Sequence, residues 1–154
     1  MRKAEREIRD QGELEEVIRR AEVCRLAMVD DGKPYIVPMN FGYRDGAFYF
    51  HCAREGRKLE VLKKNPEVCF ELEADVRIMR GEKACRWSTS YESVIGWGAA
   101  EILMEEREVR KGLEVLMSHY TEGPFDFDPR SLSLTALIKV KVERMTGKRS
   151  KRLP

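Results

Sequence analysis

The sequence predicts a mainly β protein in which about six antiparallel strands form a barrel flanked by short α-helices. Three runs of alternating polarity stand close together at 23–30, 33–43 and 47–52, with only short turns between them. Strands joined by such turns are antiparallel neighbours. Helical patterns at 57–65 and 105–120 then interrupt the remaining strands, as expected for a barrel capped by helices.

The first predicted element is an amphipathic helix at 13–21. Its apolar residues follow the spacing i, i+3, i+4, i+7, which places them on one helix face. They are Leu14, Val17, Ile18 and Ala21. The opposite face is dense in Glu and Arg, so we expect it to be solvated.

Within each of the three strands that follow, one face collects the larger apolar side chains. The turns between the strands read DDG at 30–32 and RDG at 44–46, which is typical of tight hairpins. In the third strand, Phe48, Phe50 and Cys52 lie opposite Tyr49 and His51.

The second half alternates helices with strands. A helix at 57–65 ends at Asn-Pro, and a strand at 67–73 follows. The stretch 74–81 is the least regular part of the chain. A strand at 93–104 contains two glycines, Gly96 and Gly98, which often mark a bend or a close approach of another backbone.

The clearest helix of the chain, at 105–120, precedes a loop that contains Pro124 and Pro129. A strand at 134–145 then closes the predicted barrel.

Length and charge favour one ordinary globular domain, 1–154, with flexible ends at 1–10 and 147–154. The chain has 29 basic and 27 acidic residues, a formal net charge of +2. This balance gives no electrostatic footprint for nucleic acid or an anionic membrane. The chain has no apolar run of the roughly 20 residues that span a bilayer and no signal-peptide pattern, so we expect a cytoplasmic protein.

The four cysteines, at 24, 52, 69 and 85, include no pair at metal-ligand spacing. We therefore predict no metal site. Three of them lie in predicted strands, and we expect buried, reduced and unreactive thiols.

The most informative segment for function is 39–58, which reads MNFGYRDGAFYFHCAREGRK. It ends at the start of a helix, where free backbone N–H groups and the positive end of the helix dipole favour an anion. Arg57 and Lys58 add two cations there, which suits a phosphate monoester. The alternative is that both side chains belong to an ordinary solvated helix surface.

This segment, continued to the SVIG run at 93–96, resembles the FMN-binding split-barrel superfamily of pyridoxamine 5′-phosphate oxidases. The chain is more similar still to its nitroimidazole-resistance (Nim) type flavoproteins. The segments that carry this second resemblance are CRLAMVDDGKPYIVPMNFGY, YFHCAREGRK, GEKACRWSTSYESVIGWG and MTGKRS.

The resemblance implies a homodimer with two FMN molecules at its interface. Arg57 and Lys58 would neutralise the flavin phosphate, and Asn40 with the backbone of 39–41 would bind the ring edge. His51, the predicted catalytic residue, would lie near the ring or the ribityl chain; the alternative is a histidine in the core. The implied cofactor-binding residues are Met39, Asn40, Phe41, Gly42, Phe50, His51, Cys52, Arg57, Lys58 and Ser93.

The resulting functional hypothesis is an FMN-dependent oxidoreductase. A reduced nicotinamide or a protein would donate electrons, and a small acceptor such as a nitroaromatic compound would receive them. The chain has no histidine after Ser131, so we do not expect it to oxidise vitamin B6. The alternatives are a non-catalytic flavin carrier or sensor, a haem-binding protein with His51 as the suspected ligand, and a structural dimer with a vestigial site.

Overall fold

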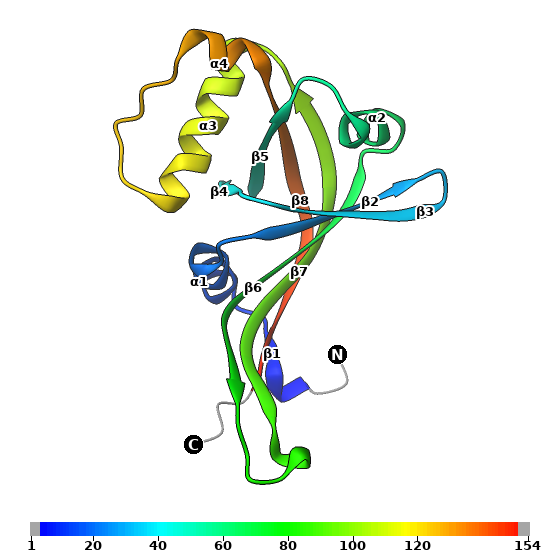
Figure 1. Cartoon of the computed structure of the whole chain (residues 1–154), viewed down its shortest axis with the longest axis vertical. Helices are drawn as coiled ribbons and strands as arrows, with labels where there is room; N and C mark the ends of the chain where they lie inside the picture. The colour runs from blue at the N-terminus through cyan, green and yellow to red at the C-terminus, as the bar shows by residue number, and fades with distance from the viewer. Residues whose placement is uncertain (1–3, 151–154) are drawn as a thin grey trace.

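The computed structural model describes residues 4–150, and residues 1–3 and 151–154 lie outside the described part (Figure 1). The helices are α1 Gln11–Arg20, α2 Arg57–Lys64, α3 Glu106–Tyr120 and α4 Pro129–Leu134, with 3₁₀ turns at Ala4–Arg6 and Ala84–Arg86. The strands are β1 Glu7–Ile8, β2 Cys24–Asp30, β3 Lys33–Met39, β4 Gly42–Arg44, β5 Ala47–Ala53, β6 Glu67–Met79, β7 Ser88–Leu103 and β8 Thr135–Arg149.

All strand pairs are antiparallel, and the strands lie in the order β3-β2-β6-β7-β8-β5-β4. The two end strands, β3 and β4, follow each other in the chain and are separated only by Asn40 and Phe41. The sheet therefore curls back on itself, but its two edges are joined by the chain and not by a ladder of hydrogen bonds. This is a split barrel, and the predicted fold class is confirmed.

The described strands number eight and not the predicted six. The run 33–43 is divided because the chain leaves β2 after Met39 and pairs with β5 from Gly42 onward. The short β1 pairs with the end of β8, where Glu7 lies opposite Lys148. Residues 7–8 and 147–149, which the sequence assigned to flexible ends, thus belong to paired strands.

A fourth helix, α4, occupies part of the predicted loop after α3. Asp128 caps it by accepting hydrogen bonds from the backbone N–H and hydroxyl of Ser131, at 2.8 and 3.0 Å. Pro129 occupies the first turn, where a missing N–H costs nothing. Among residues 4–150, no helix is long and apolar enough to cross a membrane.

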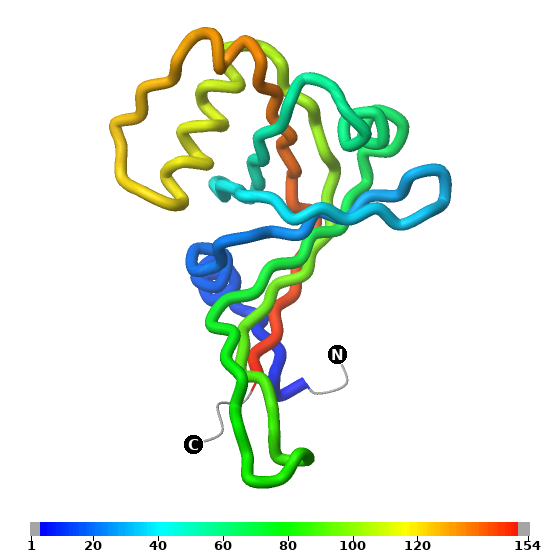
Figure 2. The backbone as a smooth tube through the Cα atoms, viewed as in Figure 1, coloured from blue at the N-terminus to red at the C-terminus, as the bar shows by residue number. Residues whose placement is uncertain are grey.

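The β6–β7 hairpin extends well beyond the rest of the sheet, toward the lower end of the molecule (Figures 1 and 2). Pairing continues to Met79 opposite Ser88, past a bulge between Ala74 and Arg77. The irregular stretch 74–81 is therefore largely strand, and the bulge explains its broken alternation.

The core fills the inside of the barrel. Its largest members are phenylalanines with no exposed surface, at 41, 48, 50 and 70. Gly96 lies beneath the Phe70 ring, where a side chain would collide with it. The sequence prediction of a close approach at the β7 glycines is confirmed, since a Cβ on Gly98 would meet the Lys141 backbone.

The β6–β7 pair presents two different faces. One packs inward and toward α1, and Leu72 and Val94 on it are fully buried. The other, which we call the outer sheet face, continues across β2 and β3 because paired residues share a face. Its members, by register, are Arg25, Val29, Ile36, Glu71, Glu73, Ser93 and Ile95, several of them well exposed.

Candidate functional site

The start of α2 is an uncapped helix N-terminus. Its N-cap residue, Gly56, has φ 127°, a conformation that strains any residue with a side chain. No side chain of residues 4–150 caps the helix, and the Gly56 carbonyl accepts from the N–H groups of Leu59 and Glu60 at 3.0 and 3.2 Å. The N–H groups of Arg57 and Lys58 precede the first helical hydrogen bonds and are open to an anion.

Arg57 links this helix start to the β2–β3 hairpin. Its Nε and Nη2 lie 3.0 and 2.9 Å from the Asp30 carboxylate. Its guanidinium carbon lies 4.4 Å from the centroid of the Tyr35 ring. Arg57 is therefore positioned beside β3, although its charge already has one internal partner.

Lys58 differs from Arg57 because it makes no ion pair within residues 4–150. Its positive charge acts on the Cys52 thiol near the end of β5. Burial raises the pKa of Cys52 above its ordinary value, and the positive charge of Lys58 opposes that shift. The structure thus brings together Cys52, Arg57 and Lys58, three of the predicted site residues.

Arg54 holds the loop between β5 and α2, a role that the sequence did not reveal. Its guanidinium donates to the backbone carbonyls of Ser133 and Met104, at 2.8 and 2.9 Å. Backbone carbonyls carry no sequence signal, so a sequence motif could not have predicted this contact.

A second group of predicted residues lies at the β3–β4 junction. Asn40 is exposed and Met39 is half-buried, whereas the Phe41 side chain is fully inside the core. Gly42 packs against α3, and a Cβ there would come within 2.5 Å of the Leu116 backbone. The side of Gly42 that a side chain would occupy is therefore filled by the helix and not by a ligand.

The last turn of α3 supports this junction. The Tyr120 hydroxyl accepts from the Phe41 N–H at 3.0 Å and from Asn40 Nδ2 at 3.3 Å. The His119 ring lies 4.3 Å from the Phe41 ring, centroid to centroid, and its Nε2 donates to the Ala21 carbonyl at 2.7 Å. His119 thus has a structural role, and the contacts of Tyr120 were not predicted from the sequence.

Phe50 and His51, neighbours in β5, differ in burial. Phe50 is fully buried beside Ile138, so only its backbone could face a ligand. His51 is exposed on the opposite face, in register with Leu137. The alternative of a histidine in the core is therefore wrong, and the catalytic role of His51 stays a prediction.

Ser93 lies apart from the other predicted site residues within one chain. It pairs with Glu73 and Lys148, and Lys148 in turn pairs with β1. β1 lies at the lower end of the molecule in Figure 1, whereas α2 lies near the top. A single chain thus does not place Ser93 beside Arg57 and Lys58.

The cysteines are free throughout the described chain. Cys24 is buried, Cys52 and Cys69 are half-buried, and burial raises the pKa of all three thiols. Cys85 is exposed on the β6–β7 hairpin, so the expectation of burial is wrong for it.

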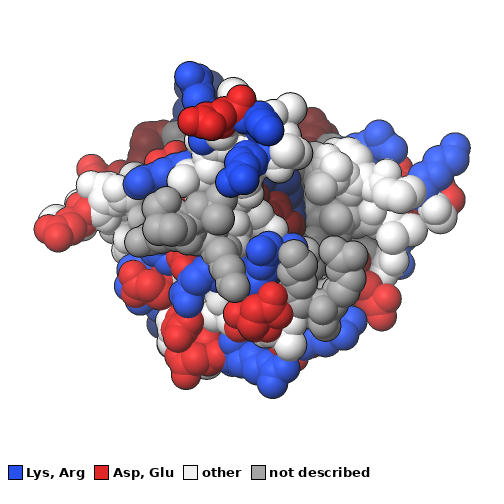
Figure 3. Space-filling view, turned by 90° about the horizontal axis from the view of Figure 1, so that it is seen from below, with Lys and Arg blue, Asp and Glu red and all other residues white. Residues whose placement is uncertain are grey.

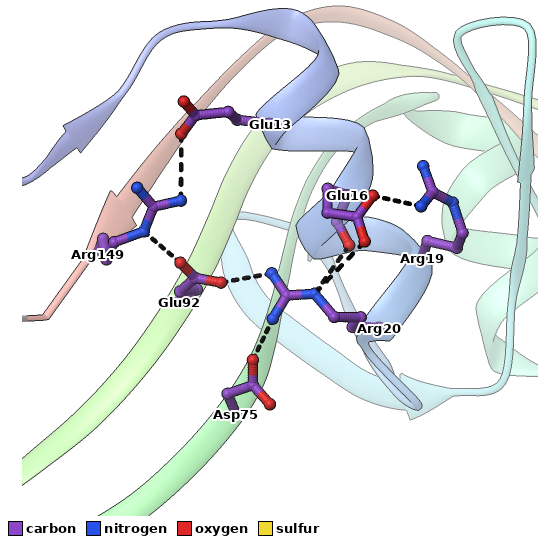
Figure 4. Close-up of polar contacts among 7 residues, drawn as sticks. All are labelled: Glu13, Glu16, Arg19, Arg20, Asp75, Glu92 and Arg149. Carbon is purple, nitrogen blue, oxygen red and sulfur yellow. Dashed lines mark hydrogen bonds and ion pairs between the residues drawn. The ribbon is translucent and has the colours of Figure 1, made fainter. Parts of the chain in front are cut away.

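A network of ion pairs ties α1 to the sheet (Figure 4). At its centre, Glu92 on β7 accepts from Arg20 of α1 and from Arg149 of β8. Burial opposes ionisation of Glu92, but the hydrogen bonds from Arg20 and Arg149 outweigh it and lower its pKa. Arg149 also reaches Glu13, at 3.1 Å, and Arg20 also pairs with Asp75.

Three surface cavities in the described chain lie elsewhere. One of about 430 Å³ lies between β5 and α3, one of about 290 Å³ beside α1 and His119, and one of about 480 Å³ at Arg25 and Asp75. None of these three is lined by a predicted site residue. Figure 3 shows the molecule from below, and acidic and basic side chains are interspersed on this face.

The family model of pyridoxamine 5′-phosphate oxidase matches residues 10–149. The chain belongs to the pyridoxamine 5′-phosphate oxidase family. This confirms the superfamily resemblance drawn from the 39–58 segment. No curated protein matches the sequence.

Among solved structures, the chain is similar to a candidate 5-nitroimidazole antibiotic resistance protein from Bacteroides thetaiotaomicron. The two are 34% identical with a TM-score of 0.82, and the match covers 92% of this chain and 85% of that one. The fold is also similar to that of the flavocytochrome Anf3 from Azotobacter vinelandii. The two are 16% identical with a TM-score of 0.82, and the match covers 96% of this chain and 71% of that one. It is similar as well to the fold of an FAD- and haem-binding protein from Mycobacterium smegmatis. The two are 17% identical with a TM-score of 0.84, and the match covers 97% of this chain and 75% of that one.

Proposed function

We propose that this family member binds FMN at the interface of a homodimer and reduces a small acceptor, such as a nitroaromatic compound. The observation that carries the proposal is the uncapped start of α2, with Lys58 lacking an internal ion pair within residues 4–150, beside the edge strand β3. Such a site suits a ligand whose anionic group binds the start of α2 while the rest of the molecule lies along β3.

The residues present fit a flavin phosphate. The N–H groups of Arg57 and Lys58 and the Lys58 ammonium provide donors, and the helix dipole adds to them. Gly56 leaves open space where a side chain would stand, since nothing lies within 4 Å of the position that a Cβ would take. Arg57 fits as a second cation because its bond to Asp30 occupies only part of its donor set.

The edge strand β3 fits the rest of the ligand. Its outer backbone groups have no neighbouring strand within residues 4–150, and it runs from Tyr35, which contacts Arg57, toward Asn40. These two residues are five positions apart, or about 16 Å along an extended strand. That separation suits a phosphate at one end and a planar ring at the other.

The homodimer is supported by the outer sheet face. Ile36 on β3 is 58% exposed, Val29 on β2 is 46% exposed and Ile95 on β7 is 39% exposed. Exposed apolar side chains gathered on one face are typical of a protein interface. Ser93 lies on this face, so a second copy is the means by which it would reach a flavin held by Arg57 and Lys58.

Bound FMN supplies reversible electron transfer, and the protein positions the reactants. A reduced nicotinamide would supply two electrons, and a nitro group would take them with two protons, leaving a nitroso group and water. An exposed ring near the end of β5 supports the proposal that His51 exchanges a proton with a small ligand. The His51→Ala variant should fold normally and turn over more slowly.

The test is an FMN titration of the apoprotein, followed by fluorescence, on the parent and the Arg57→Ala/Lys58→Ala double variant. We expect the double variant to lose affinity by about 1.5–3 kcal/mol for each charge-assisted contact. The Lys63→Ala/Lys64→Ala variant, at the other end of α2, is the matched control and should bind normally.

Equal FMN affinity in the parent and the double variant would show that the α2 start is not the phosphate site. A Soret band in the purified parent would instead favour the haem-binding alternative.

A further inference from the structure

The Tyr120 hydroxyl has all of its hydrogen-bonding capacity occupied. A hydroxyl donates one hydrogen bond and accepts two. The Glu22 carbonyl has no hydrogen to give, so Tyr120 must donate to it, at 2.8 Å. The Phe41 N–H can only donate, and it fills one of the two acceptor positions at 3.0 Å.

This arrangement fixes which way the Asn40 amide points. The remaining acceptor position of Tyr120 can only receive a donor, and Asn40 Nδ2 lies 3.3 Å from it. Asn40 must therefore turn its NH₂ group toward Tyr120. Its carbonyl oxygen, Oδ1, is then turned away from the Tyr120 hydroxyl, and within residues 4–150 that oxygen makes no hydrogen bond.

Tyr120 is itself held in place. Its neighbour His119 is tied to the Ala21 carbonyl and packs on Phe41. Glu22, which follows Ala21, lies in the linker between α1 and β2, so three segments distant in sequence meet at one hydroxyl. The fold thus holds in place the hydroxyl that orients the Asn40 amide.

We propose that Tyr120 is a positioning residue that presents Asn40 Oδ1 as a hydrogen-bond acceptor, and that this acceptor selects a ligand ring with an imide N–H at its edge. The proposal rests on the proposed flavin function. The pyrimidine edge of an isoalloxazine carries one such N–H, at N3, between two carbonyl groups. An Asn40 amide free to flip would offer its NH₂ group equally well to those carbonyls and would not select the N–H.

The experiment compares FMN with FMN methylated at N3, which removes the imide hydrogen. We expect the parent apoprotein to bind FMN about tenfold more tightly than the methylated form, the effect of one hydrogen bond. In Asn40→Ala the preference should vanish. In Tyr120→Phe it should shrink, because the amide is released while the ring still packs.

Tyr43→Phe is the matched control, since the Tyr43 hydroxyl donates to Glu15 at 3.4 Å and, within residues 4–150, makes no hydrogen bond with Asn40. It should keep the parental preference. Amide exchange at Phe41 provides a readout without any flavin, and it should accelerate in Tyr120→Phe and not in Tyr43→Phe.

The outcomes separate two failures. A parent that binds both flavins equally contradicts the role of Asn40 and leaves FMN binding intact. A preference that survives in Asn40→Ala and Tyr120→Phe assigns recognition of N3 to another group. A parent that binds neither flavin overturns the proposed function, and the selection of an imide N–H with it.

Discussion

Two glutamate clusters lie on opposite faces of the β6–β7 pair and differ in the number of arginines that pair with each glutamate. On the face toward α1, Glu92 is held by two arginines, Arg20 and Arg149, and its pKa is lowered. On the outer sheet face, Glu71 and Glu73 share a single arginine. Arg25 Nη1 lies 3.2 Å from Glu71 and 2.8 Å from Glu73.

The difference in balance is reflected in protonation. Burial and the neighbouring Glu73 carboxylate raise the pKa of Glu71 to about 7, and Arg25 only partly offsets this. Within residues 4–150, Glu92 faces two arginines, whereas Glu71 and Glu73 have one arginine between them. A surface that lacks both a cover for its apolar side chains and partners for its charges is suited to a second chain.

The largest effect is expected at Glu92. Glu92→Ala removes the carboxylate shared by two arginines, and the Glu92 side chain is only 13% exposed. We expect the free energy of unfolding to fall by about 2–4 kcal/mol, measured by urea denaturation. Glu16→Ala, which breaks exposed pairs of the same helix, is the control and should cost about 0.5 kcal/mol or less. Equal losses in both variants would remove the distinction between the two clusters.

The next effect concerns the outer sheet face. Ile36→Glu places a charge at its most exposed apolar side chain and should weaken the dimer about tenfold or more, because the charge must be desolvated on association. Sedimentation velocity over a dilution series measures this. Leu134→Glu changes a similarly exposed leucine on α4 and should leave association unchanged. A parent that stays monomeric at all concentrations argues against the interface.

A further effect is a change in pH dependence. The Glu71 carboxyl has a folded-state pKa of about 7, above its ordinary value of 4.5. Between these values the unfolded chain releases the proton and the folded chain keeps it, so the free energy of unfolding falls as pH rises and levels off above 7. Glu71→Gln should flatten this decline. Denaturation curves at about pH 5 and pH 8, on either side of most of this window, test it, and a parallel decline in both proteins would contradict the assignment.

Glu92 should act in the opposite direction. Because its folded-state pKa is lowered, its contribution is present above its ordinary pKa and is lost as pH falls through the folded-state value.

The sequence predicted the barrel because local patterns determine most of it. Alternation located β2, β3 and β5, and helical spacing located α1, α2 and α3. It did not predict the break in 33–43, because both halves alternate in the same way and only the change of partner strand separates them. It also missed α4, although Asp128 before Pro129 is a recognisable helix start.

The candidate site was only partly predictable for a similar reason. Arg57, Lys58 and Cys52 come together because they are near in sequence, across one loop. Tyr120 reaches Asn40 from 80 residues away, and Arg54 binds backbone carbonyls, so neither contact leaves a local pattern. The position of Ser93 depends on strand register, which pairs it with Glu73 and Lys148 and thus separates it from Arg57 and Lys58 within one chain.

The prolines of β3 have a consequence for how this edge meets other molecules. Pro34 pairs with Val29, and Pro38 pairs with Arg25. Ile36 lies between the two prolines, and all three share one face of the strand. Since proline has no N–H, an exposed edge that carries two of them cannot continue a ladder with a strand from a neighbouring molecule. A small planar compound has no such ladder to complete. The edge thus resists polymerisation into fibres while remaining open to a ligand.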